Sequence, residues 1–304
     1  MLHFVLTVLL TVSLYLLLRA FPRYGVHSLH AVLFNYFSCV GMGLLFSNPE
    51  SNFSTLDWTS TDTLFTLGLG VVFVTSFLLI GQTTQQSGVT TASLSSNLSL
   101  VIPVLFGLFI FKNSNKDFTV FNYLGLGLAL VSVGLSAIKK SNNNHATAAN
   151  HSLVWILPLI LFFVNGASNT LINYISSTFY QPTQSAFLTT IACTGASVFA
   201  MLVLGFRVLF YAEKVSIKSI VGGFILGIFN FLSFYFLLAT LQDFGNSAAF
   251  VFPIYNILCI LVSAFLAFLL FGETLQSLNK LGLALAILSI ILISYQEIGT
   301  ALGH

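Results

Sequence analysis

Ten apolar stretches divide the chain, each close to the length that crosses a bilayer as one helix. Their predicted ranges are 2–20, 28–47, 64–83, 89–111, 121–138, 153–175, 185–206, 219–240, 246–271 and 281–296. Charged residues make up 6% of the chain, whereas about 25% is usual for a soluble domain. So few charges cannot cover a soluble surface of this size. The sequence therefore predicts an all-α integral membrane protein with ten transmembrane helices.

The second half of the chain repeats the first at an offset of 157 residues. The matches include hydroxyl, amide and glycine residues, which are harder to ascribe to an apolar composition than matched leucines. Gly70, Ser76, Phe77, Thr83, Gln85, Gly88, Ala92, Asn122, Leu124, Gly125, Ala129 and Ser132 each have the same residue 157 positions later. An internal repeat in a membrane protein is typical of a transporter built from two halves.

A polar, low-complexity segment separates the first five predicted spans from the last five. Residues 139–152 are predicted to be a flexible linker between a first repeat, 1–138, and a second repeat, 153–304. Because five spans are an odd number, the second copy must enter the bilayer from the opposite side. The sequence thus predicts two inverted five-helix repeats, related by an axis in the membrane plane.

Amides are the polar groups that the predicted spans contain near their centres. Asn35, Asn97, Asn165, Asn230 and Asn256 each fall near the middle of a different span. A buried, unpaired amide costs about 2 kcal/mol, so these side chains must face protein, water or a ligand. Hydrogen bonding between helices explains any one of them as well as a cavity does. Five amides at similar depth favour a shared central cavity.

Further candidates for substrate contacts follow from the positions of these amides. Asn169 lies one helical turn after Asn165 and shares its face, and Tyr255 follows Pro253, which can kink the ninth span. Ser76 and Ser233 are predicted as symmetric secondary contacts. The candidate substrate-binding residues are Asn35, Tyr36, Ser76, Asn97, Asn165, Asn169, Asn230, Ser233, Tyr255 and Asn256.

The chemistry missing from the sequence excludes several classes of protein. No Gly-x-x-x-x-Gly-Lys-Ser/Thr loop is present, so the chain is not itself an ATP-driven pump. The histidines fall in loops or at span ends, where a solvated surface is the default interpretation, and the three cysteines fall in apolar runs. We therefore predict no catalytic residues, no metal ligands and no cofactor. A formal charge of +2 argues against a nucleic-acid partner.

The end of the second half resembles a known repeat. Pro253, the Gly272-Glu273-x-Leu275 motif and the Leu281-Gly282 pair are similar to the EamA-like repeat of the drug/metabolite transporter superfamily. In the first half, Asn115-Lys116 stands where that repeat has Gly-Glu. The resemblance implies a central cavity between the two halves, alternating access to it, and both termini in the cytoplasm. It also favours a location in a bacterial inner membrane.

Basic residues sort strongly between the two sides of the predicted membrane domain. One side carries Arg19, Arg23, Lys139, Lys140, Arg207, Lys214, Lys218 and Lys280, and the other carries Lys112 and Lys116. The positive-inside rule then places both termini outside, which is opposite to what the resemblance implies. We give the resemblance the greater weight.

The function predicted from the sequence is a secondary transporter or exporter of a small metabolite. Because every Lys, Arg, Asp and Glu falls in a loop or at a span end, the substrate is expected to be neutral or zwitterionic, such as an amino acid. The expected partners are this substrate and the lipid bilayer. The alternative is a non-transporting receptor or assembly scaffold, whose polar stripes would bond to one another. A channel is a third possibility, although the sequence offers no ring of charge and no filter motif.

Overall fold

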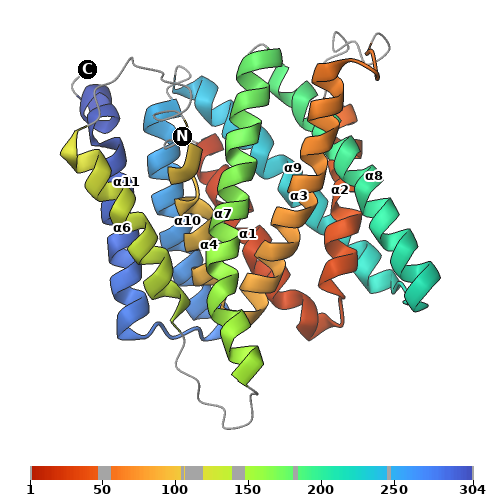
Figure 1. Ribbon diagram of the computed structural model, residues 1–304, viewed down its shortest axis with the longest axis horizontal. Coiled ribbons are helices and arrows are strands. Elements are labelled where there is room, and N and C mark those ends of the chain that lie inside the picture. The colour runs from red at the N-terminus through yellow and green to blue at the C-terminus, as the bar shows by residue number, and fades with distance from the viewer. Residues whose placement is uncertain are drawn as a thin grey trace.

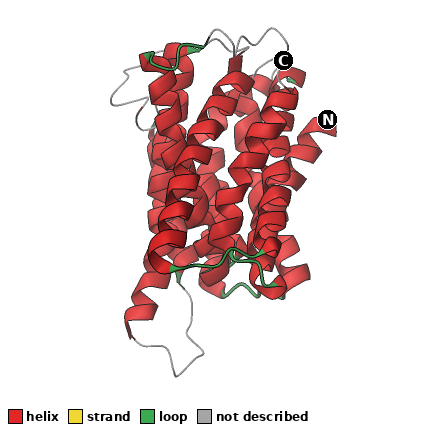
Figure 2. Cartoon of the chain, turned by 90° about the vertical axis from the view of Figure 1, so that its right-hand side faces the viewer, coloured by secondary structure: helices red, strands yellow, loops and turns green. Residues whose placement is uncertain are grey.

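The computed structural model describes residues 2–46, 56–103, 106, 119–138, 148–180, 184–244 and 248–302, and these contain helices but no β-strand. The helices are α1 (Leu2–Ala20), η1 (Phe21–Tyr24), α2 (Ser28–Phe46), α3 (Thr61–Gln86), α4 (Val89–Leu98), α6 (Val120–Ala137), α7 (Ala148–Phe179), α8 (Ser185–Tyr211), α9 (Ile217–Asp243), α10 (Ala248–Phe271) and α11 (Ser277–Leu302). They stand side by side in one bundle, with the connecting segments at its two ends (Figure 1; Figure 2).

Eight of the described helices are long and apolar enough to cross a membrane. These are α1, α2, α3, α7, α8, α9, α10 and α11. Large apolar side chains cover their outer faces: Leu209 is 81% exposed and Leu202 67%. In water such a surface would aggregate, whereas in lipid it is satisfied. The chain is therefore an all-α, multi-pass membrane protein.

The two remaining predicted spans are seen less fully. The fifth, 121–138, is α6, a shorter apolar helix of 18 residues. The fourth, 89–111, begins as α4 at Val89, but most of residues 104–111 lie outside the described part of the chain. Several boundaries differ from the prediction: α3 covers Thr61–Gln86, α4 ends at Leu98, and α11 covers Ser277–Leu302. The helix α7 begins at Ala148, inside the segment 139–152 predicted to be linker. Alanine at 148 and 149 favours helix, which composition alone did not reveal.

The described basic residues gather at one end of the bundle. N- and C-termini lie at the other end in Figure 1. We call the end away from the termini the basic end, and it carries Arg19, Arg23, Arg207, Lys214, Lys218 and Lys280. The acids Glu213 and Glu273 lie in the segments that connect α8 to α9 and α10 to α11 there. The sorting of charge predicted from the sequence therefore holds among the described residues.

Helices at corresponding positions of the two halves make corresponding contacts. Adding 157 to the bounds of α3, 61–86, gives 218–243, which lies within α9, and adding it to α6, 120–137, gives 277–294, within α11. The helix α2 packs against α9, and α8 against α3; α1 packs against α10, and α7 against α4. Each contact thus has a counterpart in which the two halves exchange roles.

Individual hydrogen bonds follow the same exchange. Ser132 Oγ donates to the carbonyl of Gly282 over 2.7 Å, and Ser289 Oγ donates to the carbonyl of Gly125 over 2.8 Å. Ser289 lies 157 positions after Ser132, and Gly125 lies 157 positions before Gly282, so the two bonds are counterparts under the repeat. These bonds hold α6 against α11.

The asparagines near the starts of α6 and α11 also make a matched pair of hydrogen bonds between the two helices. Asn122 Nδ2 donates to the carbonyl of Ile293 over 2.8 Å, and Asn279 Nδ2 donates to that of Ser136 over 2.9 Å. Asn122 also forms a capping box with Thr119, which fixes the start of α6. The α6–α11 contact is therefore held by two matched sets of side-chain bonds.

We expect Ser132→Ala and Ser289→Ala to destabilise the protein by equal amounts, about 0.6 kcal/mol each, the average for a hydrogen bond between membrane helices. The measurement is the midpoint of unfolding in mixed micelles. Ser177→Ala is the control, because Ser177 is exposed and bonds within its own helix. A loss confined to one of the two serines would show that the contacts are not energetically matched.

Candidate functional site

The predicted site residues lie in separate hydrogen-bonded clusters. The first lies between α4 and α7. Asn165 Nδ2 donates to the Ser96 carbonyl over 3.1 Å and to Ser99 Oγ over 3.0 Å, and Asn169 Nδ2 donates to Ser99 Oγ over 3.2 Å. The predicted one-turn spacing of the two asparagines thus places both against the same serine. Asn97 instead turns back on its own helix.

The second cluster lies between α2 and α9. Asn230 Nδ2 donates to Asn35 Oδ1 over 3.2 Å, and Ser233 Oγ donates to the carbonyl of Asn230 over 2.8 Å. Asn35 is fully buried, and its Nδ2 has no hydrogen-bond partner in the described part of the chain. The pairing of Asn35 with Asn230 fits the helix-packing interpretation of these two amides better than the cavity interpretation.

The remaining candidates are buried individually. The Tyr36 ring meets the Phe77 ring edge-on, with centroids 6.3 Å apart. Ser76 Oγ is buried and makes no hydrogen bond to any described residue, unlike its counterpart Ser233. Asn256 is 4% exposed. The predicted symmetry of Ser76 and Ser233 therefore extends to burial but not to bonding.

One face of α1 carries a polar stripe that was not among the predicted site residues. Thr7, Thr11 and Tyr15 recur every four residues, so they share one face of the helix. Thr7 Oγ1 donates to the Ser233 carbonyl over 2.7 Å, and Thr11 Oγ1 lies 2.8 Å from Tyr255 Oη. Since α1 also packs against α4, it lies among the helices that carry the candidates. Its regular spacing was the signal that could have revealed it.

One cavity in the described part of the chain has a volume of about 290 Å³ and lies between α3 and α7. Its walls are apolar and come from Leu64, Phe65, Gly68, Leu69, Val72, Leu171 and Ile175. None of the predicted site residues lines it. Its chemistry suits an acyl chain of the surrounding lipid.

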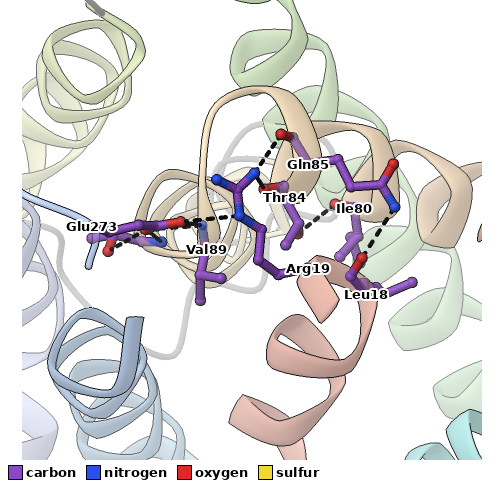
Figure 3. A network of polar contacts seen from close by, with 8 residues as sticks. Leu18, Arg19, Ile80, Thr84, Gln85, Val89 and Glu273 are labelled. Carbon is purple, nitrogen blue, oxygen red and sulfur yellow. Dashed lines mark hydrogen bonds and ion pairs between the residues drawn. The ribbon is translucent and has the colours of Figure 1, made fainter. Parts of the chain in front are cut away.

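Charged residues meet at the basic end, in a group that we call the latch: Arg19, Gln85, Glu273 and the first turn of α4 (Figure 3). The Glu273 carboxylate accepts hydrogen bonds from the Val89 N–H, over 2.9 Å, and from the Thr90 N–H, over 3.4 Å. A helix N-terminus carries a partial positive charge, so a carboxylate is favourable there. Glu273 thus caps a helix that belongs to the other half of the chain.

Gly88 permits this close approach. Its φ of +108° is one that residues with a side chain rarely adopt, and a Cβ there would lie 3.0 Å from both Glu273 carboxylate oxygens.

Arg19 and Gln85 complete the latch. Arg19 Nε lies 3.6 Å from Glu273 Oε1, and Arg19 Nη1 donates to the carbonyls of Thr84 and Gln85 at the end of α3. The C-terminus of a helix favours a cation. Gln85 Nε2 donates to the Leu18 carbonyl over 3.0 Å and also to Ser28 Oγ. The ends of α1, α3 and α10 are therefore tied to the start of α4.

The repeat does not supply a second ionic latch. The residues 157 positions from Arg19 and Glu273 are Ser176 and Lys116, which cannot form an arginine–carboxylate pair. Lys116 lies outside the described residues. Lys116 stands where the resembling repeat has glutamate, whereas the role of Glu273 is visible only in its three-dimensional contact with α4.

Comparison with known proteins adds a whole-chain match of fold. No family model matches the chain. An uncharacterized protein of Haemophilus influenzae (strain ATCC 51907 / DSM 11121 / KW20 / Rd) is 22% identical over 303 residues, covering 97% of this chain and 98% of that protein. A solved crystal structure matches with a TM-score of 0.57 and 13% identity, covering 98% of this chain and 97% of that chain. At that identity, the likeness extends to the fold alone.

A double-mutant cycle tests what Asn35 and Asn230 do. We expect Asn35→Ala and Asn230→Ala to be coupled by about 0.6 kcal/mol in stability, because the pair joins two membrane helices. Asn165→Ala paired with Asn230→Ala is the control, since these residues lie in different clusters and should be uncoupled. Zero coupling between Asn35 and Asn230 would contradict helix packing as the role of the pair and would favour the interpretation that both line a cavity.

Proposed function

We propose that the chain is a secondary transporter of a small neutral or zwitterionic metabolite, which works by alternating access between two inverted five-helix repeats. The observation that carries this proposal is the exchange of contacts between the halves. Ser132 bonds to Gly282 as Ser289 bonds to Gly125. Two modules related in this way can rock against each other while keeping equivalent contacts.

The directions of the helices support the inversion. In Figure 1, α1 runs towards the basic end and α7, at the corresponding position of the second half, runs away from it. The helices α6 and α11 are likewise opposed. Ten spans in total, counting the predicted spans 89–111 and 121–138 together with the eight long apolar helices, complete the proposed arrangement.

The latch is the proposed gate of the basic end. Glu273 comes from the second half, whereas Arg19 and the α4 N-terminus come from the first. Opening that end requires the separation of these groups. The other end has no Arg–Glu pair at the repeat-related positions; His3 and Asp243 pair there instead, so the two ends are closed by different groups and differ in the energy needed to open them. Alternating access needs such a difference to be small enough for ligand binding to reverse it.

The proposed substrate region lies along the polar face of α1 and the facing helices. Thr11 and Tyr255 meet there, and Asn165 and Asn169 lie where α7 meets α4. These groups are uncharged hydrogen-bond donors and acceptors, which suits a neutral or zwitterionic ligand. Neither an anionic phosphate nor a cation would find a compensating charge among them.

Membership of the drug/metabolite transporter superfamily is part of the proposal. The Gly272-Glu273 motif that carries the resemblance supplies the carboxylate of the latch. A bacterial inner membrane is the proposed location, and the similar protein of Haemophilus influenzae is bacterial.

A scaffold is the second candidate, because Asn35 and Asn230 bond to each other as that alternative predicts. Flux decides between them. Purified protein is screened in detergent for compounds that raise the Tm, starting with neutral amino acids, since a ligand bound only to the folded state stabilises it. A compound that raises the Tm is then tested in proteoliposomes. Transport predicts saturable flux, whereas binding without flux would support the receptor or scaffold.

A further inference from the structure

A second cluster of charged and titratable side chains lies at the basic end, apart from the latch. His27 immediately precedes α2, His30 lies in its first turn, and Glu213 comes from the segment between α8 and α9. His30 Nε2 lies 3.5 Å from Glu213 Oε1, and His27 Nε2 lies 3.9 Å from the same oxygen. One donor atom from each residue can be chosen so that all three lie within 4.8 Å of one another.

The burial of His30 corrects the sequence analysis, which assigned every histidine to solvated surface. His30 is 2% exposed because it lies in the first turn of α2 and faces the α8–α9 segment. Neither of its ring nitrogens has a hydrogen-bond partner in the described part of the chain. Its Nε2 is close to Glu213 Oε1, but only at ion-pair distance, so a ligand bound between the two groups would satisfy a buried nitrogen that makes no hydrogen bond.

The spacing of the donor atoms fits a tetrahedral metal ion. Zinc binds histidine nitrogen and carboxylate oxygen at about 2.0–2.2 Å, which places neighbouring donor atoms about 3.3 Å apart in a tetrahedron. The two histidine–carboxylate separations, 3.5 and 3.9 Å, need only a small contraction to reach that value, and all three donor atoms lie within 4.8 Å of one another. Two histidines and one glutamate form a known donor set for zinc, with the fourth position left to water.

Surrounding residues hold these donors in place. The backbone N–H of His27 donates to Ser219 Oγ over 2.9 Å. Arg207 Nη1 donates to both carboxylate oxygens of Glu213, over 3.2 Å to Oε2 and 3.5 Å to Oε1, and Oε1 is also the oxygen that lies beside the two histidines. Such partners orient the ligands of a metal site. The ring centroids of His27 and His30 lie 4.5 Å apart, so the two imidazoles are direct neighbours beside Glu213.

We propose that His27, His30 and Glu213 bind a divalent transition-metal ion of the zinc class at the basic end. The ion would join α2, in the first half, to the α8–α9 segment, in the second half. It would occupy no part of the latch or of the proposed substrate region. The proposal does not depend on transport, because it concerns binding alone.

The test is zinc binding to the intact protein, freed of any histidine tag and treated with a chelator. We expect one equivalent of Zn²⁺ to bind and the Tm to rise with zinc concentration. His27→Gln should lower the affinity by about 100-fold or more, because it removes a direct ligand. The His27 side chain is 54% exposed, so this change is not expected to disturb folding. Co²⁺ should give the absorption of a tetrahedral site, which His27→Gln abolishes.

His3→Gln is the matched control, since His3 lies at the other end of the bundle, paired with Asp243. It should bind zinc as the wild type does. Unchanged zinc affinity in His27→Gln, or no zinc binding by the wild type, would overturn the proposal. A loss of binding in His3→Gln equal to that in His27→Gln would also overturn it.

Discussion

Gly227→Ala is expected to destabilise the protein by about 3 kcal/mol, the upper part of the usual range for overpacking. A Cβ at Gly227 would lie 2.2 Å from the carbonyl oxygen of Asn35 and 2.5 Å from Ser38 Cβ. The first of these atoms belongs to the backbone of α2, so no side-chain rotation relieves the clash. The helices α2 and α9 would have to separate, which would also break the Asn35–Asn230 bond. The measurement is the unfolding midpoint in mixed micelles.

The repeat predicts the same effect at a second glycine, Gly70. Gly70 lies 157 positions before Gly227, and a Cβ there would lie 2.1 Å from the backbone nitrogen of Ala196 in α8. Gly70→Ala should therefore cost as much as Gly227→Ala. Gly68→Ala is the control within α3, because nothing lies within 4 Å of its Cβ. It should be neutral or stabilise by about 0.5 kcal/mol, since alanine is the better helix former. Equal results at Gly68 and Gly70 would contradict the described packing.

Glu273→Gln should open the basic end. The change removes the negative charge from the α4 N-terminus and from Arg19, and we expect a loss of about 2 kcal/mol, typical of a favourable, partly buried charge at a helix end. That loss shifts the balance between the closed and open basic end by about 30-fold. A cysteine at Ser93, buried in α4, should then react faster with a water-soluble maleimide by up to the same factor. The native cysteines are buried as Ser93 is, and Cys259 lies beside it, so all three are replaced by alanine before the new cysteine is introduced.

Lys280→Gln is the control for this measurement. Lys280 is an exposed residue at the same end and takes no part in the latch. Its removal should leave the labelling rate at Ser93 unchanged. If Glu273→Gln also left the rate unchanged, the latch would not hold the basic end closed.

Much of the fold was predictable because the bilayer limits what the sequence can do. The first span was predicted at 2–20, and α1 covers Leu2–Ala20, since a membrane helix must be apolar over a set length. The repeat offset also predicted which residues would have counterparts. The offset could not predict that Ser132 bonds to Gly282. An offset relates positions in the sequence and does not say which helix surfaces meet.

The candidate site was predicted less well, for two physical reasons. Amide spacing placed Asn165 and Asn169 on one face correctly, but no pattern within a helix shows whether Asn35 meets a ligand or Asn230. Residues such as Thr7 and Thr11 are weak signals of a site on their own, because threonine is common in apolar helices and can bond to its own backbone. The roles of Glu273 and His30 depend on contacts between distant segments, which local sequence does not encode.

The central claim is that the two ends of the bundle open in turn, and distances between spin labels on the two halves test it most directly. One pair, at Tyr24 and Thr274, spans the basic end, and the other, at Thr59 and Thr178, spans the opposite end; all four positions are exposed. With Glu273→Gln, we predict that the Tyr24–Thr274 distance increases while the Thr59–Thr178 distance decreases. Both distances unchanged, or both changed in the same direction, would contradict alternating access.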